Sequence, residues 1–275
     1  MMKRILVGLG GTPSTDAAVR QAIDVAQRHR AELTGMAVSD LKRLANVGPV
    51  SIGGDAYARR LREHRRVVTK ERIEEAIGKF ESACKTAGLS WQVRREMGDP
   101  FKLMVSQARY HDVTVFGLND LFDYGVVKEP RDLLSWLVDA GTQPMLAVAA
   151  EARAVQRVLI AYDGSIASAG AMKQFIQLNL WPNASIRIVC FSKKVEDAQQ
   201  LLNDATAYCR LHGHETDAQR LSGEAQQQLL QHATEWEADL IVMGQRARRR
   251  LTRRLFGDAT TQVMRHADQS VFLAR

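Results

Sequence analysis

The chain has 275 residues, enough for one large domain or two domains of ordinary size. Apolar residues make up 45% and charged residues 25% of the chain, a balance that excludes disordered and collagen-like proteins. No apolar run approaches the roughly 18–20 residues that span a bilayer, and no secretory apolar region follows the start, so we expect a cytoplasmic protein without membrane contact. The net charge of +7 favours anionic partners in general.

The elements predicted for the first half alternate between strand and helix. A short apolar run that ends at glycines, KRILVGLGGT over 3–12, is typical of a buried parallel strand. A Gly/Pro-punctuated loop follows the second strand over 46–55, and a long charged helix follows that loop over 57–87. The remaining predicted elements are a helix over 16–30, strands over 32–38 and 91–95, a helix after Pro100, and strands over 112–117 and 143–148.

The second half repeats this order. The segment QRVLIAYDGS over 156–165 matches 3–12 in its basic lead-in, its apolar run and its closing Gly-hydroxyl pair. The further predicted elements are a helix over 167–180, strands over 185–191 and 215–221, a helix after Gly223, a strand over 239–244, a helix over 260–267 and a strand over 269–274. This alternation predicts parallel sheets covered by helices on both faces. We place the two domains at 1–150, with an insertion at 46–70, and at 154–275.

The turn after the first strand of the second half is one candidate site, because open parallel sheets bind ligands beyond the carboxyl ends of their strands. Asp163 can accept hydrogen bonds from sugar hydroxyls or an amine, Gly164 permits a tight turn, and Ser165 can cap the next helix. A capping turn without any ligand is the alternative interpretation of these residues.

The loop after the fourth strand is the second candidate. Gly244 ends the strand, Gly257 precedes the next predicted helix, and six arginines lie over 246–254. Glycine at a helix start lets phosphate oxygens approach bare amides, and arginine adds charge-assisted contacts. Two alternatives remain: a solvated helical face, and a nucleic-acid patch, which the lack of interleaved aromatic residues disfavours.

Other catalytic and metal-binding signals are missing from the sequence. Cys84, Cys190 and Cys209 form no CxxC pair, which argues against a zinc site or a disulfide framework and favours buried, neutral thiols. No Ser-His-Asp or Cys-His arrangement can be assembled, and no Walker-type loop is present. We therefore expect no catalytic residue, no metal site and no enzyme; slow ATP hydrolysis would lack an identifiable general base.

These motifs resemble the universal stress proteins, and the second half is similar to their ATP-binding branch. That branch's loop reads glycine, two residues, glycine, nine residues, glycine, then Ser or Thr; here Gly244, Ala247, Gly257 and Asp258 keep the spacing. The resemblance covers the chain in two copies and implies two tandem Rossmann-like (adenine nucleotide alpha hydrolase-like) α/β domains, each with a five-stranded, mostly parallel sheet.

The resemblance also implies the ligand and its site. ATP, with Mg²⁺, would be bound by the second domain, with Asp163 at ribose or adenine and the backbone near Phe191 reading the adenine edge. The phosphates would be lined by Gly244, Gln245, Arg246, Gly257, Asp258 and Ala259. By this reasoning Gly244→Val abolishes binding and leaves the fold intact.

Two departures from the family loop weaken the expected site. Ala247 replaces a glycine, and Asp258 places a carboxylate where a hydroxyl would meet phosphate. The first half departs further, because Gly10 stands at the Asp position and Pro130 near that of the third glycine. We expect no nucleotide site there.

The predicted function is that of a stress-response protein whose second domain holds an adenine nucleotide and thereby alters partner contacts or homodimer formation. The alternatives are a dimeric scaffold with a dead site, and a binder of another anionic ligand through the arginine loop.

Overall fold

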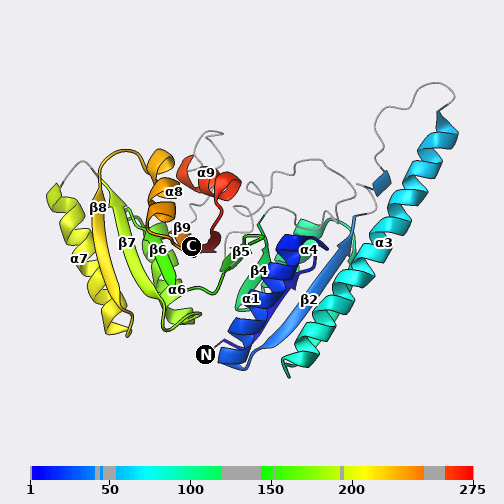
Figure 1. Cartoon of the computed structure of the whole chain (residues 1–275), viewed down its shortest axis with the longest axis horizontal. Helices are drawn as coiled ribbons and strands as arrows, with labels where there is room; N and C mark the ends of the chain where they lie inside the picture. Colours follow the sequence, from blue (N-terminus) through cyan, green and yellow to red (C-terminus); the bar gives the residue numbers. More distant parts are fainter. Residues whose placement is uncertain are drawn as a thin grey trace. The chain divides into compact units, whose positions relative to one another are not determined.

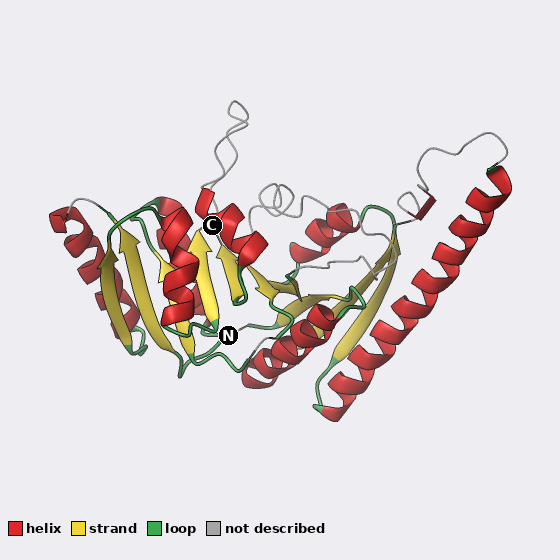
Figure 2. Ribbon diagram, turned by 45° about the horizontal axis from the view of Figure 1, so that its top comes forward, coloured by secondary structure: helices red, strands yellow, loops and turns green. Residues whose placement is uncertain are grey.

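The computed structural model describes residues 2–40, 44–45, 54–118, 144–151, 153–192, 195–244 and 258–274 (Figure 1). The chain divides into two compact units, one up to Arg131 and one from Asp132 onward. Each is an α/β unit in which helices lie on either side of the strands (Figure 2). The fold class predicted from the repeat is confirmed.

The first unit is built on a parallel sheet with the strand order β3-β2-β1-β4. Its strands β1 and β4 are almost wholly buried, which explains their continuous apolar sequences. The elements are β1 (Arg4–Gly8), α1 (Pro13–His29), β2 (Glu32–Ser39), α3 (Asp55–Thr86), β3 (Trp91–Met97), α4 (Pro100–Ala108) and β4 (Val113–Gly117).

The second unit has the strand order β5-β10-β9-β6-β7-β8, parallel except at β5. Its core includes Phe175, whose ring centroid lies 5.4 Å from that of Phe272 and 6.4 Å from that of Trp181. The elements are β5 (Met145–Val148), β6 (Arg157–Ala161), α6 (Ile166–Leu178), β7 (Ser185–Phe191), α7 (Val195–Leu211), β8 (Thr216–Leu221), α8 (Ala225–Glu235), β9 (Leu240–Gly244), α9 (Asp258–His266) and β10 (Ser270–Ala274).

The repeat did not indicate where β5 lies. This last strand of the first repeat joins the second unit's sheet and runs antiparallel to β10, with Ala147 opposite Val271 and Met145 opposite Leu273. All four β5 residues are buried. The pairing supplies the edge of β10 with backbone hydrogen-bond partners that it would otherwise lack. β5 is the fifth strand of the first repeat, and its pairing with β10 adds it to the five strands β6 to β10 of the second repeat.

The first helix of each unit begins with the same local chemistry. Thr12 caps α1 and Ser165 caps α6, each accepting a hydrogen bond from the amide of the residue three positions on. Each helix ends at a left-handed residue, Arg30 or Asn179. The hydroxyl and the glycine before it, which the sequence repeats, thus set where both helices start.

An aspartate at the start of the fourth strand joins it to the first strand in both units. The Asp112 carboxylate accepts from the amides of Lys3 and Arg4, at 2.6 and 2.9 Å. The Asp239 carboxylate accepts from the amides of Gln156 and Arg157, both at 2.9 Å. The repeated aspartate therefore has a structural role at the amino end of each sheet.

None of the helices in the described ranges is both long enough and apolar enough to cross a membrane. The longest of them, α3, has 32 residues but is rich in charge.

Candidate functional site

The candidate site lies at the carboxyl edge of the second unit, defined here as residues 162–165 after β6, 191–192 at the end of β7, and Gly244 at the end of β9. The chain leaves β6 toward β7 on one side and later places β9 on the other side, so the strand order reverses between β6 and β9. Crevices at such reversals are where open parallel sheets bind ligands. The sequence candidates Asp163 and Gly244 thus lie at the carboxyl ends of the two adjacent strands, β6 and β9, where the order reverses.

Asp163 is held in place by the turn that starts α6. One carboxylate oxygen, Oδ1, accepts hydrogen bonds from the Ser165 amide at 2.9 Å and from the Ser168 hydroxyl at 2.7 Å. The Ser165 hydroxyl accepts from the Ser168 amide at 3.2 Å. Ser165 is thus the residue that caps α6. The Asp163 carboxylate is held by the turn but stays exposed to solvent at the carboxyl edge.

Gly164 is required by this turn for two reasons. Its φ of +73° is a left-handed conformation that side chains disfavour, and a Cβ there would lie 2.8 Å from the Leu201 side chain of α7. The turn is therefore both conformationally special and closely packed.

The first unit has the same turn without the carboxylate. Gly10 donates its amide to the Thr15 hydroxyl at 3.1 Å, and Gly11 has a φ of +68°. Thr12 and Thr15 stand where Ser165 and Ser168 stand in the second unit. The turn chemistry survives in both units, but an acidic group is present only in the second.

Gly244 serves packing, and this corrects the expectation that Gly244→Val leaves the fold intact. A Cβ on Gly244 would lie 2.4 Å from the Ala167 carbonyl carbon and from the Ser168 amide nitrogen. Gly117 is the equivalent in the first unit, with Ser14 Cβ at 2.6 Å. Both glycines let the end of the fourth strand touch the backbone of the first helix, so a valine at Gly244 would displace α6.

Phe191 is the last residue of β7 and is half-buried beside Leu221 of β8. The next carbonyl, that of Ser192, accepts from Arg220 Nη1 at 3.0 Å. Cys190 lies next to this edge in the sequence, and Tyr162 is part of it. Burial raises the pKa of the Cys190 thiol and of the Tyr162 hydroxyl, so both groups are neutral at physiological pH. The backbone near Phe191 lies at the carboxyl edge, as expected.

Apart from Gly244, the side chains predicted to line the phosphates all lie outside the described part of the chain. Gln245, Arg246 and Gly257 lie outside the described residues. Asp258 and Ala259 are the first two residues of α9, and their side chains also lie outside the described part of the chain.

Two residues at the carboxyl edge were missed by sequence reasoning. Ser168 anchors Asp163, and the paired spacing Thr12/Thr15 and Ser165/Ser168 would have indicated it. Arg220 brings a cation to the edge, but nothing in the β8 sequence distinguishes it from an ordinary surface arginine.

The family model of the universal stress protein family matches residues 1–115 and 154–275. The chain belongs to the universal stress protein family. The universal stress protein Slr1230 of Synechocystis is 29% identical over 136 residues, which is 48% of this chain. The alignment spans about half of that relative, 47% of its length. A universal stress protein structure from Archaeoglobus fulgidus covers 99% of this chain and 98% of its own, with 16% identity and a TM-score of 0.70, which supports the fold.

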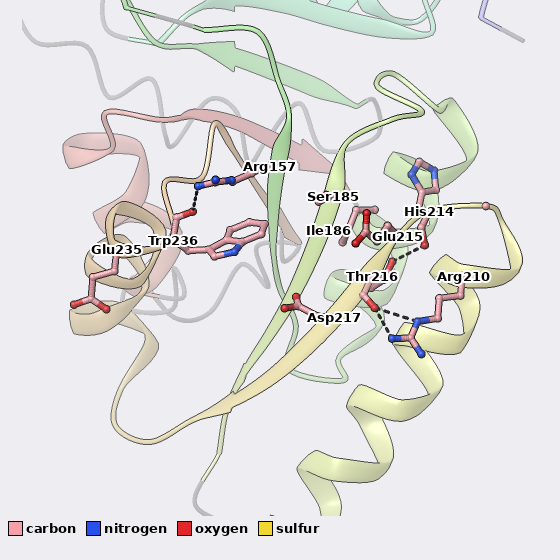
Figure 3. Close-up of a pocket in the computed structure, with 11 residues that line it drawn as sticks. Arg157, Ser185, Ile186, Arg210, His214, Glu215, Thr216, Asp217, Glu235 and Trp236 are labelled. Carbon is pink, nitrogen blue, oxygen red and sulfur yellow. Dashed lines mark hydrogen bonds between the residues drawn. The ribbon is translucent and has the colours of Figure 1, made fainter.

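A hollow of about 860 Å³ opens at the opposite edge of the same unit of this universal stress protein (Figure 3). It is lined by the amino ends of β6, β7 and β8 and by the carboxyl ends of α7 and α8. Its cations are engaged within the protein: Arg157 donates to the Trp236 carbonyl at 3.2 Å and pairs with Glu237, while Arg210 donates to the Thr216 carbonyl at 2.7 Å. These contacts join helix ends to strand starts, so we assign the hollow no ligand.

Proposed function

We propose that the second unit of this universal stress protein binds an adenine nucleotide, ATP, at the carboxyl edge between β6 and β9. The observation that carries the proposal is the position of Asp163: an exposed carboxylate, fixed by two hydrogen bonds, where the strand order reverses. A positioned carboxylate is suited to accept hydrogen bonds from ribose hydroxyls or an exocyclic amine.

The two units differ in the feature that the proposal uses. Both keep the glycine turn, the capping hydroxyl and the glycine at the end of the fourth strand, so these serve the fold. The first unit has Gly10 where the second has Asp163. We therefore assign nucleotide binding to the second unit alone.

Mg²⁺ would arrive with the nucleotide. Among the described residues, no group of three or more His, Cys, Asp or Glu side chains is placed to hold a metal ion. In nucleotide sites Mg²⁺ usually keeps several waters and is bound through one or two carboxylates together with the phosphates of the nucleotide. We propose that bound nucleotide alters partner contacts or dimer formation and that the protein is not an enzyme.

Isothermal titration of the full chain with MgATP tests the proposal, after mass spectrometry has checked for co-purified nucleotide. We expect one site per chain with a micromolar dissociation constant, a binding free energy of about −8 kcal/mol. Asp163→Asn keeps an acceptor for Ser165 and Ser168 but removes the charge, and should weaken binding about tenfold, the value of one charge-assisted contact.

Glu215→Gln is the control, because it removes one exposed carboxylate charge at the opposite edge of the same unit. It should leave the affinity for ATP unchanged. Equal affinity of Asp163→Asn and wild type would contradict the site, and absence of any binding would contradict the proposal.

A scaffold with a dead site is the second candidate, and the position of Asp258 favours it. Asp258 is the first residue of α9, where a carboxylate stabilises a helix without any ligand and would repel a triphosphate. Asp258→Ser should tighten ATP binding if the site is a weakened one. If neither the wild type nor Asp258→Ser binds ATP, the scaffold is the better account.

A further inference from the structure

The helix α3 extends beyond the unit to which it belongs. It has 32 residues, whereas its counterpart in the repeat, α7, has 17. Its buried residues begin at Thr69, with Ala58 as the one exception before it. Figures 1 and 2 show the amino-terminal part of α3 running past the strands of its own sheet. We call residues 55–68 the α3 overhang; it forms most of the described part of the insertion predicted at 46–70.

The charges on the overhang are unbalanced. It contains five arginines and two acidic residues, Asp55 and Glu63. Four of the arginines are exposed and make no ion pair with any described residue: Arg59, Arg60, Arg62 and Arg66. The excess cations therefore face solvent.

The other half of α3 is different, because several of its charges are paired. Arg95 lies 3.1 Å from Glu74, and Lys79 lies 2.9 Å from Glu75 and 3.8 Å from Asp16. The contacts of Glu74 with Arg95 and of Lys79 with Asp16 join α3 to β3 and α1, and the contact of Lys79 with Glu75 lies within α3. Within the described ranges, the overhang offers no such partners to its four exposed arginines, so their clustering is not explained by the packing of the fold.

The exposed arginines form a row along the helix. Arg59, Arg62 and Arg66, continued by Lys70, recur every three or four residues and share one face. At a rise of about 1.5 Å per residue the row is roughly 16 Å long. Arg60 lies about 100° around the helix axis from Arg59, so cations flank the exposed surface on two sides.

We propose that the α3 overhang binds the phosphate backbone of duplex DNA, without sequence specificity. A projecting helix fits the major groove, which is about 12 Å wide, and cations on both flanks can reach the phosphates on either side of it. Guanidinium groups bind phosphate oxygens in a bidentate manner.

The composition of the exposed face favours DNA over other anionic partners. Its exposed large apolar side chains are few: Tyr57 is 69% and Val67 47% exposed, and the two lie ten residues apart. A helix that inserts into a bilayer needs a broad apolar face, and a protein interface needs an apolar centre. Phosphate contacts need neither.

Sequence reasoning considered nucleic acid only for the run at 246–254, because the exposed face of α3 is not evident from the sequence.

Fluorescence anisotropy with a labelled duplex of about 20 base pairs tests the proposal, using the full chain over roughly 50–200 mM salt. The overhang variant is Arg59→Gln/Arg62→Gln/Arg66→Gln, in which glutamine keeps a helix propensity close to that of arginine. The matched control is Arg20→Gln/Lys102→Gln/Arg109→Gln, which removes the same charge from exposed positions of the same unit. Circular dichroism establishes that both variants keep their helix content.

We expect wild type and the control to bind alike. The overhang variant should bind at least about tenfold more weakly at 0.1 M salt, and the slope of log K against log salt should fall by about 0.9 for each phosphate that the variant no longer neutralises. Equal weakening in the control would show that net charge alone acts, and would overturn the proposal. The proposal would also be overturned if binding were lost only when Arg248, Arg249 and Arg250 are substituted. Competition by polyglutamate or by anionic vesicles as strong as competition by unlabelled DNA would overturn it too.

Discussion

Replacing Gly244 by alanine tests how the second unit is assembled. The added Cβ would lie 2.4 Å from two backbone atoms of α6, well inside van der Waals contact. Backbone atoms cannot rotate away as a side-chain end can, so α6 must shift from β9. Overpacking of this kind typically costs about 1–3 kcal/mol.

Gly78→Ala is the matched control, because the same methyl is added where the structure leaves room. Gly78 lies inside α3, and apart from its chain neighbours and the helix's own backbone no atom lies within 4 Å of a Cβ built there. Alanine in a helix interior is favoured over glycine by about 0.5–1 kcal/mol. The two substitutions should therefore change stability in opposite directions.

Differential scanning calorimetry measures both effects. With about 2–4 °C per kcal/mol, Gly244→Ala should lower Tm by roughly 2–12 °C and Gly78→Ala should raise it by up to about 4 °C. An unchanged Tm for Gly244→Ala would refute the contact between β9 and α6 and, with it, the geometry that brings Asp163 beside the end of β9.

Three further predictions concern stability and reactivity. Asp239→Ala removes the acceptor of two successive backbone amides and should cost about 1–3 kcal/mol in urea unfolding, whereas full stability would contradict that role. Burial lowers the pKa of His111, whose ring contacts Thr34, below its usual 6.5. As pH falls, the unfolded chain therefore takes up a proton before the folded chain does, and stability that is present above about pH 6.5 is lost. His111→Asn should flatten the dependence of the free energy of unfolding on pH below about pH 6.5. Burial raises the pKa of Cys84 and Cys209 to about 12, so a thiol reagent at neutral pH should modify both only after unfolding, and rapid labelling of the native protein would contradict their burial.

The sequence predicted most elements because their local signals are strong. Short apolar runs closed by glycine gave the central strands, and the hydroxyl of Ser165 gave the start of α6. The start of α1 was placed three residues late, because Thr12 was not considered as its cap. The pairing of β5 with β10 was not predictable in the same way. Strand order depends on long-range packing, and the β5 sequence MLAV carries no information about its neighbour.

The position of the candidate residue Asp163 could be predicted for a related physical reason. Asp163 follows a strand at a position that topology makes accessible, and a motif can show that. The packing role of Gly244 could not be seen, because a glycine that admits a ligand and a glycine that admits a helix look alike in sequence. The same holds for Arg220, which is an ordinary surface residue until its strand is placed.

Photolabelling with 8-azido-ATP, followed by peptide mapping, tests the central claim most directly. The account predicts that the labelled peptides come from residues 154–275, that they include the segments around Asp163 or Phe191, and that excess ATP prevents the labelling. Labelling that maps to residues 2–118, or that excess ATP does not compete away, would contradict the assignment of nucleotide binding to the second unit.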